Sequence, residues 1–200
     1  MSDTIMVDTS LLDIPEFNER RTTQVAALLA HYSGGQISVY KLVKLIYLID
    51  RTSLERRGRP VTFDRPYNLP FGPTPSHTYD LVCKPWEGEY WSQYFSRPQG
   101  YIIKLIKDDI SSDELSQAQI DLINDVFKKF GKKSFGQLKN HLHSLPEFDD
   151  PGGSSNPIDW NTLLKATGWS DEDLITIRQE FDAKAKFENM LRNMENDNTR

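Results

Sequence analysis

Cysteine and histidine are scarce in this 200-residue sequence, which contains one cysteine, Cys83, and four histidines. A single cysteine excludes an intramolecular disulfide and leaves no cysteine cluster for a structural zinc site. His141 and His143 are two residues apart, so a helix would direct their rings to different sides, and the other two histidines are isolated in the sequence. We therefore expect no metal ion and a fold stabilised by its own apolar core.

Long apolar runs and an excess of positive charge are also missing. No stretch approaches the length of a membrane span, and the acidic first nineteen residues do not resemble a signal peptide. The 24 lysines and arginines are outnumbered by 29 acidic residues, which gives a net charge of −5. The sequence thus lacks a global field that would attract nucleic acid or an anionic membrane. These absences favour a cytoplasmic protein and argue against binding to nucleic acid or to a membrane.

Motifs of catalysis and nucleotide binding are absent as well. The glycine pairs at 34–35 and 152–153 lack the lysine and the preceding strand of a phosphate-binding loop. No serine lies in a nucleophile-elbow pattern, and Cys83 follows two apolar residues, which favours buried packing over a reactive thiol. We expect no cofactor and no enzymatic activity. A small hydrolase that uses Cys83 or His77 is an alternative of a different class.

The longest stretch with helical periodicity is 39–57, VYKLVKLIYLIDRTSLERR. Its apolar residues recur at spacings of three and four and form a stripe wide enough to contact more than one neighbour. Ser38 can cap the start of this helix, and Gly58 can adopt the left-handed conformation that ends one. The pattern predicts a central helix in the core, with Lys44 and Asp50 on its remaining surface.

Other segments predict a mainly α fold with a small β element, an α+β domain packed around the central helix. Two helices are expected to begin with capping boxes, at Ser116 with Gln119 and at Ser134 with Gln137. Two short strands are expected at 59–64 and 101–106, paired with each other. The remaining helices are expected at 22–32, from Thr74-Pro75 with Thr74 as its cap, at 158–166, and from Ser170, which is expected to cap the last helix.

The predicted organisation has three parts. Residues 1–20 are expected to form an acidic mobile arm, 21–192 a single compact helical domain, and 193–200 a disordered tail. The helix before the central helix, with its glycine turn, resembles a DNA-binding helix-turn-helix, but the second helix is too apolar to enter a major groove. Aromatic residues gather in 84–100, where they either cover the core or anchor a partner, and core packing is the favoured alternative.

Two motifs together resemble a known family. The first runs from Lys41 to Asp50 as KLxKLxYxxD, and the second is Gly72-Pro73 followed by Tyr79. This pair is similar to the Panacea domain (DUF4065), found in SocA-like antitoxins, and the likeness in element order covers about 22–169. The resemblance implies a mainly helical domain that neutralises a cognate protein toxin by direct binding, with no catalytic activity.

Seven residues are candidates for that contact, because aromatic and arginine side chains dominate protein interfaces. They lie near the Gly-Pro turn, in the aromatic stretch and at the end of the central helix: Phe71, Tyr79, Trp86, Trp91, Arg51, Arg56 and Arg57. A homo-oligomer and a heterotetramer with the toxin are both open. The alternatives are an adaptor that delivers a client to other machinery and, less favoured, a DNA-binding transcriptional regulator.

Overall fold

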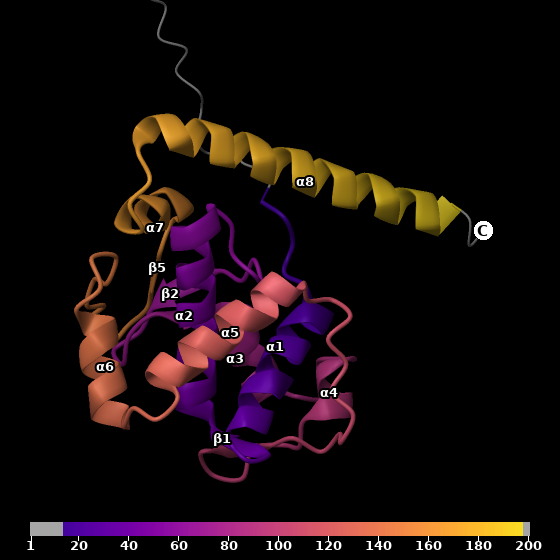
Figure 1. Cartoon of the computed structure of the whole chain (residues 1–200), viewed down its shortest axis with the longest axis vertical. Helices are drawn as coiled ribbons and strands as arrows, with labels where there is room; N and C mark the ends of the chain where they lie inside the picture. Colours follow the sequence, from indigo (N-terminus) through magenta and orange to yellow (C-terminus); the bar gives the residue numbers. More distant parts are fainter. Residues whose placement is uncertain (1–13, 198–200) are drawn as a thin grey trace, which may run out of the picture. The chain divides into compact units, whose positions relative to one another are not determined.

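The computed structural model describes residues 14–197 (Figure 1). The chain forms two compact units. One unit is Phe17–Trp169, and the other combines the segment up to Glu16 with that from Ser170. The fold is mainly α-helical with a few short strands, as predicted. The candidate site lies within the unit 17–169.

The central helix is confirmed. Helix α2 spans Val39–Arg57, with the Ser38 hydroxyl accepting a hydrogen bond from the Lys41 amide and Gly58 in the left-handed region at φ 66°. Its apolar side chains are buried on several sides, and helices α1 (Glu19–Tyr32) and α5 (Gln117–Phe130) both pack against it. Figure 1 shows α5 and α1 beside α2 within this unit. The wide apolar stripe therefore serves two neighbours at once.

Helix boundaries follow the capping chemistry. Both predicted capping boxes are present, at Ser116 for α5 and at Ser134 for α6 (Phe135–His143). Helix α1 begins earlier than predicted because the Asn18 side chain accepts from the Arg21 amide and caps it. The last two residues of the predicted arm therefore belong to a helix, while 1–13 lie outside the described residues.

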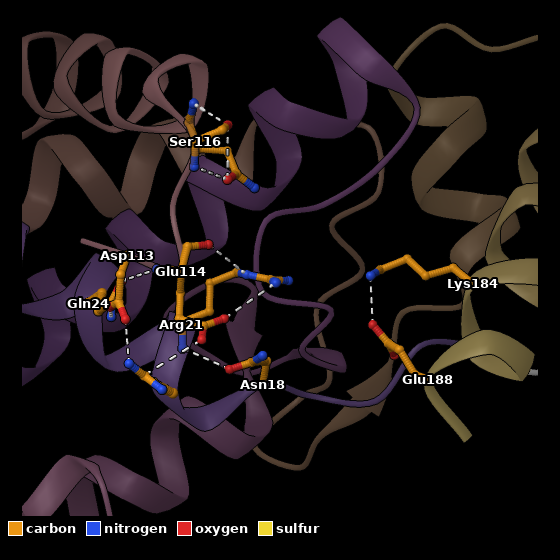
Figure 2. Close-up of polar contacts among 10 residues, drawn as sticks. Asn18, Arg21, Gln24, Asp113, Glu114, Ser116, Lys184 and Glu188 are labelled. Atoms are coloured by element: carbon orange, nitrogen blue, oxygen red, sulfur yellow. Dashed lines mark hydrogen bonds and ion pairs between the residues drawn. The ribbon is translucent and has the colours of Figure 1, made fainter. Parts of the chain in front are cut away.

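Polar contacts fix α1 to the segment that precedes α5 (Figure 2). The side-chain amide of Gln24 donates to Asp113 over 2.6 Å, and its carbonyl oxygen accepts from the Glu114 amide over 3.0 Å. The guanidinium of Arg21 donates to the Glu114 carbonyl oxygen over 3.3 Å. Because Gln24 is buried and its amide uses both ends, this contact sets where α5 starts relative to α1.

The strands form two small antiparallel sheets. In one, β1 (Gln36–Ser38) pairs with β4 (Ile102–Lys104). In the other, β2 (Pro66–Asn68) lies between β3 (Thr74–Pro75) and β5 (Asn156–Pro157). The predicted strand at 101–106 thus contains β4, but its partner is β1. The predicted strand at 59–64 is wrong, since that segment is a loop without strand pairing, exposed at Arg59 and buried from 60 to 64.

Three short helices complete this unit, namely α3 (Ser76–Cys83), α4 (Trp91–Tyr94) and α7 (Trp160–Ala166). The carboxylate of Glu19 accepts from the backbone amides of Tyr90 and Trp91 and so holds the start of α4 against α1. The predicted helix at 158–166 begins two residues late, because Asp159 caps α7.

The second unit contains α8 (Asp171–Asp197). Its start is capped as predicted, with the Ser170 hydroxyl accepting from the Asp173 amide over 3.2 Å. Within the helix Lys184 pairs with Glu188 at 2.6 Å, one turn apart (Figure 2). The helix includes 193–197 of the predicted disordered tail, and 198–200 lie outside the described residues.

Candidate functional site

Lys44, the second lysine of the motif, lies inside the fold. Only 2% of its surface is exposed, and its Nζ donates to the carbonyl oxygens of Gly72 at 2.6 Å and Pro73 at 3.0 Å. It also donates to the Thr74 hydroxyl. Burial lowers the pKa of this lysine from 10.5 to about 7. The expectation that Lys44 lies on the surface is wrong, because the Gly-Pro turn covers it and supplies its acceptors.

Asp50, at the end of the motif, is buried for a related reason. Its carboxylate accepts from the backbone amides of Val61 at 2.8 Å and Thr62 at 2.9 Å, and from the Thr62 hydroxyl. Burial raises the pKa of Asp50 to about 7. These bonds use the amides that a strand at 59–64 would need, which explains why that segment is a loop.

A second buried aspartate organises the start of α3. Asp64 accepts from the amides of His77 at 2.9 Å and Thr78 at 2.7 Å and from the Thr78 hydroxyl at 2.6 Å. Thr74 was predicted to cap this helix, but its hydroxyl is bonded to Lys44 instead. The His77 ring also contacts Asp64 at 3.0 Å, and this hydrogen bond raises the pKa of His77.

Glu147 joins the far end of the matched region to the motif helix. Its carboxylate is buried and lies 2.6 Å from the Tyr47 hydroxyl and 2.7 Å from Nε of Arg51. The Arg51 side chain is only 14% exposed. Arg51, a candidate for toxin contact, therefore neutralises a buried carboxylate within the fold.

The motif residues thus serve the architecture of the domain. From Lys44, Tyr47 and Asp50 on α2, hydrogen bonds reach three separate segments and hold them in place. A buried polar group without a partner is costly, so each of these contacts specifies one position for its segment. Contacts with another protein must come from the surface that this network supports.

One such surface is an aromatic groove at the N-terminal end of α2. The centre of the Tyr40 ring lies 4.4 Å from the centre of the Phe135 ring. The centres of the Phe135 and Phe71 rings lie 5.7 Å apart in an edge-to-face arrangement. The Tyr40 hydroxyl donates to the Phe71 carbonyl oxygen over 3.2 Å. The groove has a volume of about 430 Å³. Its lining residues are Ser38, Tyr40, Lys41, Phe71, Tyr101, Phe135 and Leu138.

Large apolar area is exposed at this groove. Phe71 is 53% exposed, Phe135 51% and Tyr101 86%. The position of Phe71 is fixed by the residue after it, because Gly72 has φ 100° and its backbone lies against Leu142. A Cβ at Gly72 would come within 2.9 Å of the Leu142 Cβ, so this turn requires glycine.

The other candidates do not join this groove. Arg56 pairs with Asp125 at 3.1 Å and Arg57 donates to the Ala118 carbonyl oxygen at 3.2 Å, both at the C-terminal end of α2. Because a helix rises about 1.5 Å per residue, the C-terminal end of α2 lies roughly 25 Å from Tyr40 along the helix axis. The arginines and Phe71 therefore belong to different parts of the surface.

The three candidates from α3 and the aromatic stretch differ in exposure. Trp91 is fully buried, which removes it from the surface available to a partner. Tyr79 is 42% and Trp86 58% exposed, and the Arg97 guanidinium lies over the Trp86 ring at 4.9 Å. Cys83 is exposed, contrary to the expectation of buried packing, and its hydrogen bond with Tyr79 raises the pKa of that tyrosine.

Sequence reasoning missed Tyr40, Tyr101 and Phe135. Tyr40 precedes the motif on the same helix. Phe135 follows the Ser134 cap, and an apolar residue in the first turn of a helix is usually predicted to be buried in the core. Phe71 was found because it precedes the Gly-Pro turn. The four aromatic residues come together through contacts between segments that lie about thirty to ninety-five residues apart in the chain, which no local pattern reveals.

Two features are absent from the described residues. Between residues 14 and 197, no cluster of three or more histidine, cysteine, aspartate or glutamate side chains forms a set of metal ligands. None of the helices in that range has the length and apolar character needed to cross a membrane.

Comparison with known families identifies the domain. The model for the SocA-like antitoxin, Panacea domain, matches residues 42–147, which is 106 of the 200 residues. No curated protein and no solved structure matches the chain. The matched range begins in the motif of α2, includes the Gly-Pro turn and ends at Glu147, the carboxylate that bonds Tyr47 and Arg51. The chain therefore belongs to the SocA-like antitoxin family with a Panacea domain.

Proposed function

We propose that this protein is an antitoxin that neutralises a cognate protein toxin by binding it directly, without catalysis. Family membership supports the antitoxin role. The observation that carries direct binding is the aromatic groove, an exposed apolar surface on a domain whose buried polar network holds its walls. Exposed aromatic rings gathered in a hollow are typical of protein interaction sites.

The groove has the properties of an interface centre. Phe71 and Phe135 are each about half exposed, so a partner can bury substantial apolar area on both. The Tyr40 hydroxyl and the buried Lys44 hold the turn that presents Phe71. Because the backbone is already ordered, little conformational entropy is lost when a toxin binds there.

A rescue experiment tests this proposal. Each neighbouring gene is expressed alone and together with this chain, and growth is measured. We expect one product to arrest growth, co-expression to restore growth, and the two purified proteins to form a complex in size-exclusion chromatography. The proposal is wrong if neither neighbouring product inhibits growth, or if the chain fails to restore growth.

Variants locate the contact. Replacement of Phe71 and Phe135 by alanine should weaken toxin binding by roughly tenfold or more, because aromatic anchors dominate interface energies. Phe187→Ala is the matched control, since Phe187 is 56% exposed but does not line the groove, and Trp86→Ala tests a candidate outside the groove. Charge reversal of Arg56 and Arg57 tests the competing surface, and we expect rescue to persist in that variant.

A further inference from the structure

The segment that forms one wall of the groove is strongly basic. Residues 126–146 contain five lysines and no aspartate or glutamate, although the whole chain carries a net charge of −5. The acids that flank this segment are both paired, Asp125 with Arg56 and Glu147 with Arg51. Positive charge in this segment is therefore not balanced by neighbouring acids in the chain.

One of these lysines adjoins the aromatic groove, and another lines a hollow beside it. The ammonium of Lys139 lies 5.4 Å from the centre of the Phe71 ring. Lys41 lines the groove and also lines an adjacent hollow of about 400 Å³, whose wall includes Lys132. Neither hollow has an acidic residue among its described lining residues. The groove and the hollow beside it thus have Lys41, Lys132 and Lys139 at their edges, which form a cationic rim.

The lysines of this segment act on a histidine that lies within it. The pKa of His141, on α6, is lowered first by burial and then by the nearby charges of Lys129 and Lys133. Glu147 acts in the opposite direction, but its effect on this pKa is smaller than those of the two lysines and of Arg51. The balance around the C-terminal end of α5 and α6 is therefore cationic.

From this arrangement we infer that the groove binds a toxin segment in which apolar or aromatic side chains alternate with acidic ones. The apolar side chains fill the hollow between Tyr40, Phe71 and Phe135, and the carboxylates pair with Lys132 and Lys139 on the rim. Complementary charge speeds association and excludes basic segments of similar shape. This inference rests on the proposed function for the identity of the partner.

A protein segment fits this site better than nucleic acid does. A nucleic-acid backbone needs a continuous positive track, whereas here the lysines border a hollow lined mainly by aromatic rings. The net charge of −5 opposes approach of a polyanion to the rest of the surface. A short segment with apolar and acidic side chains can fill the hollow and pair with the lysines on its rim.

Peptide probes test the inference on the full-length chain. Three fluorescein-labelled peptides are compared by anisotropy: one alternates leucine and phenylalanine with glutamate, a second has lysine for glutamate, and a third has serine for the apolar residues. We expect only the first to bind, with an affinity that falls as salt is added. The double variant Lys132→Glu, Lys139→Glu should weaken its binding by roughly tenfold.

Lys84→Glu combined with Lys165→Glu is the matched control, because it changes the net charge equally at lysines that do not line the groove. Its affinity for the glutamate peptide should equal that of the unmodified chain. Equal binding of the lysine peptide, no binding of the glutamate peptide, or tighter binding of a labelled single-stranded oligonucleotide would each overturn the inference. The assay contains no toxin, so its failure is distinct from a failure of growth rescue.

Discussion

The ammonium group of Lys44 lies 2.6 Å from the carbonyl oxygen of Gly72, inside the fold. This contact joins the helix motif to the Gly-Pro turn, the two sequence features that mark the family. The same turn carries Phe71 into the aromatic groove. Gly72, which accepts the buried hydrogen bond, directly follows Phe71, whose ring is exposed in the groove. A change at Lys44 should therefore affect both the stability of the turn and the position of Phe71.

Replacement of Lys44 by methionine should destabilise the domain. Methionine keeps much of the side-chain length but leaves two buried carbonyl oxygens and the Thr74 hydroxyl without their donor. We expect a loss of roughly 1–3 kcal/mol in the free energy of unfolding, measured by urea denaturation. Lys41→Met is the control, since half-buried Lys41 donates to one carbonyl oxygen, that of Gly131, and should cost less. An equal loss in both variants would contradict the role assigned to the Gly-Pro turn.

The same lysine should make stability depend on pH. Its pKa is lowered from 10.5 to about 7 in the folded chain, so between these values the unfolded chain binds the proton and the folded chain does not. The contribution of Lys44 to stability therefore rises as pH increases from about 7 toward 10.5. Each unit of pKa difference corresponds to about 1.4 kcal/mol. Unfolding of the Lys44→Met variant across this range should lack that increase, and parallel curves for the two proteins would refute the assignment.

Asp50 should act in the opposite direction at lower pH. Burial raises its pKa from 3.8 to about 7, so between these values the folded chain binds a proton that the unfolded chain releases. Its contribution to stability therefore falls as pH increases from about 4 to about 7. Asp50→Asn keeps an oxygen for the amides of Val61 and Thr62 but cannot titrate. Thermal unfolding of this variant should show a weaker fall over that range than the parent chain.

Gly72→Ala should disturb the presentation of Phe71. An added Cβ would meet Leu142, and a left-handed conformation costs a non-glycine residue roughly 1–2 kcal/mol. Gly152→Ala separates these effects, because Gly152 also has positive φ, at 58°, but open space around it. We expect a larger loss of thermal stability for Gly72→Ala, together with weaker binding of the glutamate peptide. Equal losses for both variants would mean that contact with Leu142 is unimportant.

Local sequence patterns predicted the elements whose ends depend on nearby residues. The bounds of α2, the Ser116 and Ser134 capping boxes and the Ser170 cap were predicted because a cap and its acceptor or donor lie within four residues. The start of α3 was misassigned for the opposite reason. Its amides bond to Asp64, more than ten residues away, while Thr74, the expected cap, is used by Lys44.

The sequence by itself determined that the chain forms a mainly helical domain around α2 and contains the paired motifs of the Panacea family. Helical periodicity and caps are local, so they can be read along one segment. Only the tertiary structure decided that Lys44 and Asp50 are buried, that Trp91 belongs to the core, and that Phe71 meets Tyr40 and Phe135. Burial and proximity depend on which distant segments pack together. A long charged side chain in an amphipathic helix also looks the same in sequence whether it donates its hydrogen bonds to water or to a carbonyl oxygen.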